Sequence, residues 1–174
     1  MPENLDLLLG IAEVSVGLIT FTALLLVLRQ LVGGQLTEFH VMFIKGNAAL
    51  GILTALFSLL PLALLRLNVE TQWVWSISSG LLASALILLL AWYSKARKKA
   101  APNRRQNIGS IFASVTGVIS PLVLIPHAFG VIYAGSSGPY AICLLLVLLT
   151  LAISFFQTLG DFLLPFAKPT EDEQ

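Results

Sequence analysis

The stretch SKARKKAAPNRRQ at residues 94–106 decides how the rest of the chain is interpreted. It holds six of the ten basic residues and no acidic residue, and long apolar segments lie on both sides of it. A short basic loop between membrane spans stays on the cytoplasmic side, and its position sets the orientation of the other spans. The stretch therefore predicts a membrane protein in which residues 94–106 form a cytoplasmic loop.

The composition of the whole chain also indicates the membrane class. Of the 174 residues 57% are hydrophobic and 11% are charged, and the mean hydropathy is +0.90. A soluble domain carries about 25% charged residues. A single cysteine, Cys143, leaves no disulfide within one chain, and His40 and His127 lie too far apart in sequence to form a ligand motif. We expect no metal, no cofactor and no catalytic residues.

Five apolar segments are long enough to cross a bilayer, which requires about 20 residues. They cover residues 7–28, 46–65, 73–93, 108–133 and 140–162, and a polar tail follows at 166–174. The chain is thus predicted to be one all-α integral membrane domain over residues 1–174. Pro121 and Pro126 leave an alternative in which the fourth segment is broken or re-entrant and four spans remain.

The basic residues predict the orientation of these spans. With a cytoplasmic loop after the third span, the N-terminus lies outside and the C-terminus inside. Nine of the ten basic residues then fall inside and only Arg66 falls outside, as the rule for positive charges requires. The compact loops favour the inner (plasma) membrane of a bacterium.

Four of the segments carry small and polar residues at helical spacing, so that each forms a stripe along one face. We expect these stripes to face one another and the third span, apolar in its inner half, to be the most lipid-exposed. Close helix packing explains such stripes, and a partly hydrated interior is the alternative. The stripes are Gly10, Glu13, Gly17 and Thr20; Asn47, Gly51, Thr54, Ser58 and Pro61; Gly109, Ala113, Thr116, Ser120 and His127; and Cys143, Thr150, Ser154, Gln157 and Asp161.

Two ionisable residues on these stripes suggest a site. Glu13 and His127 each lie about 9 Å from the outer end of their span, with Ser58 near that level and Arg66 above it. A charge inside the hydrocarbon costs about 2.5–3.5 kcal/mol, so we hypothesise that Glu13 and His127 face one another and bind a proton or a ligand. The alternative is that Glu13 is protonated or paired with Arg66, and that His127 only packs. A second polar group is expected at the inner face, from Asp161, Gln157, Asn47 and Lys45.

The basic loop itself predicts contact with anionic lipid at the cytoplasmic face, at about 1 kcal/mol for each basic residue near the surface. The alternative is that it only sets the topology. The loop lacks the interleaved aromatic residues of a nucleic-acid site, so we expect no nucleic-acid partner. Its basic residues are Lys95, Arg97, Lys98, Lys99, Arg104 and Arg105.

Three functions remain compatible with the sequence. The favoured one is a structural or accessory subunit that acts through helix–helix contacts, in a homo-oligomer or a larger membrane complex. The second is a small oligomeric channel or transporter that uses the polar stripes and the Glu13/His127 site. The third is a membrane-embedded enzyme, which ranks last because no set of nucleophile, base and orienting group is apparent.

Overall fold

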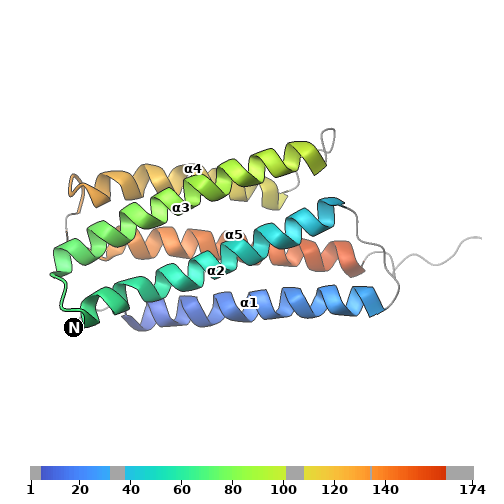
Figure 1. Cartoon of the computed structure of the whole chain (residues 1–174), viewed down its shortest axis with the longest axis horizontal. Coiled ribbons are helices and arrows are strands. Elements are labelled where there is room, and N and C mark those ends of the chain that lie inside the picture. The colour runs from blue at the N-terminus through green and yellow to red at the C-terminus, as the bar shows by residue number, and fades with distance from the viewer. Residues whose placement is uncertain (1–4, 32–37, 101–107, 134, 164–174) are drawn as a thin grey trace, which may run out of the picture.

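The computed structural model describes residues 5–31, 38–100, 108–133 and 135–163, and these residues form a bundle of five helices (Figure 1). Each helix is long and apolar enough to cross a membrane, which confirms the predicted all-α membrane class. The helices are α1 (Leu5–Leu31), α2 (Glu38–Arg66), α3 (Thr71–Ala100), α4 (Ile108–Ala128) and α5 (Gly138–Leu163).

Consecutive helices run in opposite directions, so the bundle has two distinct ends (Figure 1). The turn between α2 and α3 and the connection between α4 and α5 lie at one end, which we call the turn end. The last turns of α3, with Lys95, Arg97, Lys98 and Lys99, lie at the other end, which we call the basic end.

Helix boundaries differ from the expected spans by five residues or more in three places. α4 is continuous through Pro121 and Pro126, as a full span requires, but it ends at Ala128. Residues 129–133 leave the helix, and Gly130 and Tyr133 have positive φ angles of 69° and 49°. α3 continues to Ala100, so residues 94–100, expected in the loop, are helical. Basic side chains in a last helical turn are favourable because they face the negative end of the helix dipole. α2 begins at Glu38, eight residues before the expected span.

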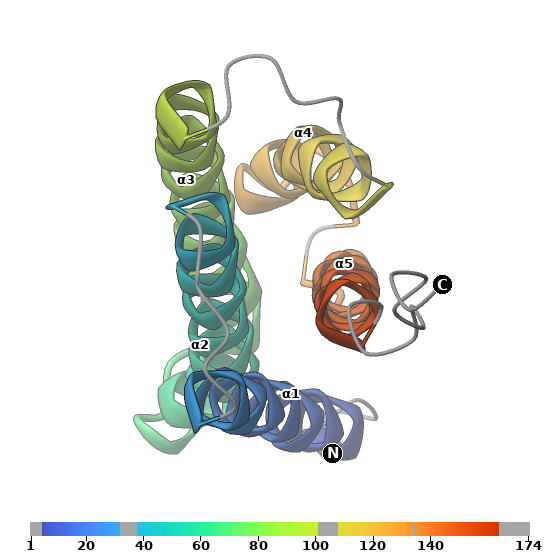
Figure 2. The ribbon, with the colours of Figure 1, turned by 90° about the vertical axis from the view of Figure 1, so that its right-hand side faces the viewer.

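The helices are not equally covered. Viewed from the basic end, α2 lies between α1 and α3, while α4 and α5 form the other side of the bundle (Figure 2). In the most apolar 18-residue window of each helix, 44% of the residues are buried in α5 and 39% in α3, against 22% in α1 and α2. Our prediction that the third span is the most lipid-exposed is therefore wrong. Lipid is as apolar as a leucine-rich bundle interior, so the lack of a polar face on α3 did not reveal which side it buries.

Three of the four stripes turn inward as predicted. Asn47, Gly51, Thr54, Ser58 and Pro61 of α2 are all buried, and so are Thr116, Ser120 and His127 of α4 and Cys143, Thr150 and Ser154 of α5. Gly51 lies at the closest approach, because a Cβ atom there would be 2.5 Å from Cγ1 of Ile19 on α1.

The stripe of α1 points the other way, which corrects our expectation. Glu13, Gly17 and Thr20 are exposed on the outside of the bundle. A Cβ atom added at Gly10 or Gly17 would meet no atom within 4 Å. α1 instead packs against the bundle with a mainly apolar face, made of Leu8, Ile11, Ala12, Ser15 and Thr22.

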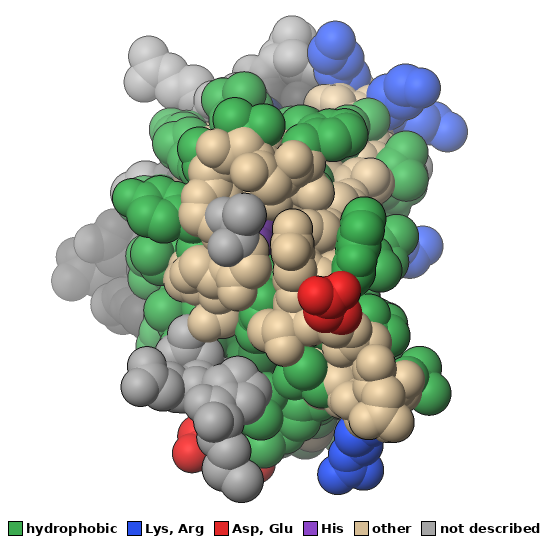
Figure 3. All heavy atoms as spheres, turned by 90° about the vertical axis from the view of Figure 1, so that its left-hand side faces the viewer, with side chains coloured by type: hydrophobic (Ala, Val, Ile, Leu, Met, Phe, Trp, Pro, Cys, Tyr) green, Lys and Arg blue, Asp and Glu red, His purple; other side chains and the backbone are tan. Residues whose placement is uncertain are grey.

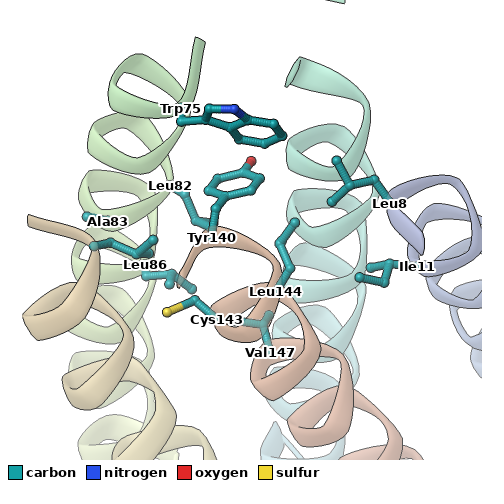
Figure 4. Close-up of a cluster of buried hydrophobic side chains, with 11 residues drawn as sticks. Leu8, Ile11, Trp75, Leu82, Ala83, Leu86, Tyr140, Cys143, Leu144 and Val147 are labelled. Atoms are coloured by element: carbon teal, nitrogen blue, oxygen red, sulfur yellow. The ribbon is translucent and has the colours of Figure 1, made fainter. Parts of the chain in front are cut away.

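Near the turn end, a hydrophobic cluster joins the helices (Figure 4). The rings of Trp75 on α3 and Tyr140 on α5 lie 5.9 Å apart, with Leu8 and Ile11 of α1 on one side. The Tyr140 hydroxyl donates a hydrogen bond to the carbonyl of Phe57 on α2. Pro61 has no N–H to bond that carbonyl four residues back, so Tyr140 supplies the donor that the α2 backbone lacks.

Candidate functional site

His127 is the central polar residue of the turn end. It is 1% exposed, and its Nε2 lies 2.9 Å from the carbonyl of Ser136, in the α4–α5 connection. A carbonyl can only accept, so Nε2 carries the hydrogen and donates it. Nδ1 lies 2.8 Å from Oγ of Ser79 on α3, and in the neutral ring it accepts the Ser79 hydroxyl hydrogen. The ring thus ties α3, α4 and the connection to α5.

Glu13 is not a direct partner of this ring, since both ring nitrogens are engaged elsewhere. Glu13 is exposed on the outer face of α1, and Arg66 is exposed at the end of α2. Ser58 is buried and donates to the carbonyl of Thr54 in its own helix. Figure 3 looks onto the turn end, where hydrophobic and uncharged polar atoms cover most of the surface. The structure therefore does not assemble these four residues around one site.

At the basic end the predicted polar residues are also separated. Asn47 is buried, and its side-chain amide donates to Oγ1 of Thr158 over 3.5 Å. Lys45 is exposed and Gln157 is half-buried. Asp161 belongs to α5, but its side chain lies outside the described residues.

A cavity of about 60 Å³ lies in the half of the bundle toward the basic end, among α2, α3, α4 and α5. One part of its wall is polar, with Asn47, Ser154 and the hydrogen-bonded pair Thr116 and Thr150, whose hydroxyl oxygens are 2.8 Å apart. The remainder is mostly apolar and includes Phe43, Leu50, Leu86, Leu89, Leu90 and Val147. This is the amphipathic type of lining that suits a small-molecule or lipid site.

Tyr93 lies where this cavity approaches the end of α3. Its ring packs against Gly46, where an added Cβ atom would be 3.5 Å from Cδ2 of the tyrosine. Its hydroxyl oxygen is enclosed and has no hydrogen-bond partner among the described residues. Buried hydroxyl groups almost always have a partner, so the Tyr93 hydroxyl, like those of Ser78 and Ser120, lacks an expected partner among the described residues.

Basic side chains lie beyond the cavity. Lys95, Lys98 and Lys99 are exposed on the last turns of α3, and Arg97 is half-buried there. Arg104 and Arg105 lie outside the described residues. The predicted basic surface is thus partly a helical one, formed by the end of α3.

Three residues of these two regions were not predicted as site residues. Ser79 and Ser136, the partners of His127, belong to the uncharged polar residues of α3 and of the α4–α5 connection, and only three-dimensional proximity distinguishes them from their neighbours. The position of Tyr93 at the end of a span predicts an aromatic residue at the membrane interface. Nothing in the sequence shows that its hydroxyl is enclosed.

In the described residues, no group of three or more His, Cys, Asp or Glu side chains could hold a metal ion. Comparison of the chain with protein-family models, with curated proteins and with solved structures finds no match.

Proposed function

We propose that this protein is an accessory subunit of the membrane that assembles with other transmembrane helices through the outer face of α1. The observation that carries this proposal is the outward position of the stripe formed by Gly10, Glu13, Gly17 and Thr20. The partner is a second copy of the chain or a helix of a larger membrane complex.

Glu13 gives the strongest support. It lies eight residues from Leu5 at the start of α1, about 12 Å along the axis, in a helix with the composition of a membrane span. A carboxylate facing lipid at such a depth costs about 2.5–3.5 kcal/mol, and polar residues inside membranes almost always face protein or water. A neighbouring helix that covers Glu13 and offers it a hydrogen bond removes this penalty.

The two glycines support the same interface. Small residues allow membrane helices to approach closely, so that their backbones contact one another. Gly10 and Gly17 leave such space on the outer face of α1, whereas Gly51 of α2 is already filled by Ile19 of α1 within the chain. The channel alternative has less support, because the Trp75–Tyr140 cluster fills the half of the bundle toward the turn end.

Cysteine cross-linking in native membranes tests the proposal. In a Cys143→Ala background, Gly17→Cys should form a cross-linked product, and Leu56→Cys, which lies on the exposed surface of α2, should not. Gly17→Leu should abolish the association while the chain stays folded, because nothing in the bundle contacts this position. Equal cross-linking at both sites, or an unchanged association of Gly17→Leu, would contradict the interface.

The proposal includes the orientation and the location of the chain. We place the N-terminus outside and the C-terminus inside, in the inner membrane of a bacterium, with the basic end against anionic lipid. This follows the distribution of basic residues. A reporter active only in the cytoplasm should be active when fused after Gln174 and silent when inserted at Asn68. The reverse pattern would overturn the orientation.

A further inference from the structure

The cavity near the basic end has a size that limits its occupant. At about 60 Å³ it has room for several water-sized groups, since one water requires about 10–15 Å³. Sites for drug-sized ligands measure about 300–1,000 Å³. A short part of one hydrocarbon chain therefore fits, and a whole soluble ligand does not.

The lining indicates the chemistry of that occupant. Leu86, Leu89 and Leu90 of α3 and Phe43 of α2 offer an apolar wall. Tyr93, at the same wall, has an enclosed hydroxyl with no acceptor among the described residues. Side chains of a helix lean toward its N-terminus, so this hydroxyl lies deeper in the membrane than the Tyr93 backbone. An ester carbonyl at the top of an acyl chain is an acceptor that lies just below a lipid headgroup.

Positive charge lies on the two helices that meet at Tyr93. Lys45 directly precedes Gly46, against which the tyrosine ring packs, and is exposed. Arg97 lies one turn beyond Tyr93, on the same face of α3. Both therefore belong to the headgroup level above the cavity, and both are suited to a negatively charged headgroup.

We propose that this cavity is a specific binding site for one anionic phospholipid. The headgroup lies against Lys45 and Arg97, an ester carbonyl accepts the hydrogen bond of Tyr93, and part of one acyl chain enters between α2, α3 and α4. This inference deepens the anionic-lipid contact proposed above, because it replaces a diffuse attraction by a defined site. It is independent of the interface on α1.

Native mass spectrometry of the purified full chain tests the site, with phosphatidylglycerol and phosphatidylcholine of identical acyl chains as the probes. The unmodified protein should retain phosphatidylglycerol preferentially. The double variant Lys45→Gln/Arg97→Gln should weaken its binding about thirtyfold, since each basic residue near the surface contributes roughly fivefold. Lys98→Gln/Lys99→Gln, which removes the same charge from the same end, is the matched control and should change binding much less.

Three further variants separate entry of the acyl chain from binding of the headgroup. Ala113→Leu places a larger side chain in the cavity wall and should abolish retention of both lipids, while Ser84→Leu, on the exposed side of α3, should not. Tyr93→Phe removes only the hydroxyl and should weaken binding about fivefold. Thermal unfolding of each variant shows that it remains folded.

Each other result would overturn the site. Unchanged binding by Ala113→Leu means that no acyl chain enters the cavity. Equal losses in the two charge variants mean that the contact is diffuse, which leaves the anionic-lipid contact of the basic end intact but removes the defined site. Equal retention of the two lipids excludes headgroup selection. Displacement of phosphatidylglycerol by equimolar oleate identifies a single-chain carboxylate as the preferred occupant. Cross-linking through Gly17 should be unchanged in all these variants.

Discussion

The two ends of the bundle differ in how completely side chains fill the space among the helices. At the turn end, Trp75, Tyr140 and the aliphatic residues around them fill the space among the helices. Toward the basic end, α2, α3, α4 and α5 surround a cavity, and the hydroxyl of Tyr93 in its wall has no partner among the described residues. The turn end is thus a filled core, although the Ser78 and Ser120 hydroxyls have no partner among the described residues, whereas the half toward the basic end keeps an internal space.

The buried hydroxyls of Tyr140 and Tyr93 show the difference between the two ends most clearly. Tyr140 donates to a carbonyl that Pro61 leaves without a helical donor. Tyr93 has an equally enclosed hydroxyl and no acceptor among the described residues. The same group therefore has a protein acceptor at one end and none among the described residues at the other, and substitutions at the two tyrosines should show the difference.

The largest difference is expected from shortening a core side chain at each end. Trp75→Ala should lower the free energy of unfolding by about 3 kcal/mol, the low end of the range for such truncations, because lipid is apolar and only lost packing remains. Leu89→Ala, beside the cavity, should cost about 1 kcal/mol because fewer atoms contact that side chain. Steric-trapping measurements in bicelles give both values. Equal losses at the two positions would contradict the difference in packing.

Removal of the Tyr140 hydroxyl should have the next largest effect. Tyr140→Phe leaves the Phe57 carbonyl without a donor and should cost about 1–2 kcal/mol, between the typical values for buried hydrogen bonds in water and in membranes. In a Pro61→Ala background the same substitution should cost less than about 0.5 kcal/mol, because the new N–H of residue 61 bonds that carbonyl. A double-mutant cycle without such coupling would show that Pro61 and Tyr140 act independently.

A smaller loss is expected at the histidine of the turn end. Ser79→Ala removes the partner of Nδ1 of His127 and should cost about 1 kcal/mol. Ser84→Ala is the matched control on the same helix, since its residue is exposed and its hydroxyl bonds the carbonyl of Gly80 within the same helix. Its effect should stay within about 0.5 kcal/mol. Chemical shifts of His127 should change in the first variant alone. Unchanged His127 shifts in Ser79→Ala would contradict a hydrogen bond between Ser79 and Nδ1 of His127.

The smallest change in the free energy of unfolding is expected at Tyr93. Tyr93→Phe should leave the free energy of unfolding of the delipidated protein within about 0.5 kcal/mol of the original value, or raise it slightly, because an unpartnered hydroxyl is removed. The same unfolding measurement used for Tyr140→Phe provides the comparison. A loss as large as that of Tyr140→Phe would mean that the Tyr93 hydroxyl has a protein partner after all.

Hydropathy was sufficient to predict five membrane helices, since the length and the apolar character of a segment decide whether it spans the membrane. Periodicity also grouped most residues of each stripe on one face, with Ala113 and Gln157 half-buried and the burial of Gly109 and Asp161 outside the described part of the chain. It did not show where a stripe points: Gly17 on α1 and Gly51 on α2 occupy similar patterns, yet one faces outward and the other contacts Ile19. In a membrane a small polar face turns toward another helix, and the sequence does not say whether that helix belongs to the same chain. The cavity could not be predicted either, because it depends on how α2, α3, α4 and α5 pack against one another in three dimensions.

The hydrogen bond between Tyr140 and Phe57 also has a consequence for the order of synthesis. Its two residues are 83 positions apart, so at ordinary rates of translation the donor follows the acceptor by roughly 4–17 s. During that interval the newly inserted α2 carries a carbonyl without its helical partner, in surroundings that offer no other donor. The arrival of α5 ends this exposure and fixes the register of the two helices at once. A chain that stops before Tyr140 retains the defect, so the proline in α2 makes the bundle sensitive to whether its last helix has been made.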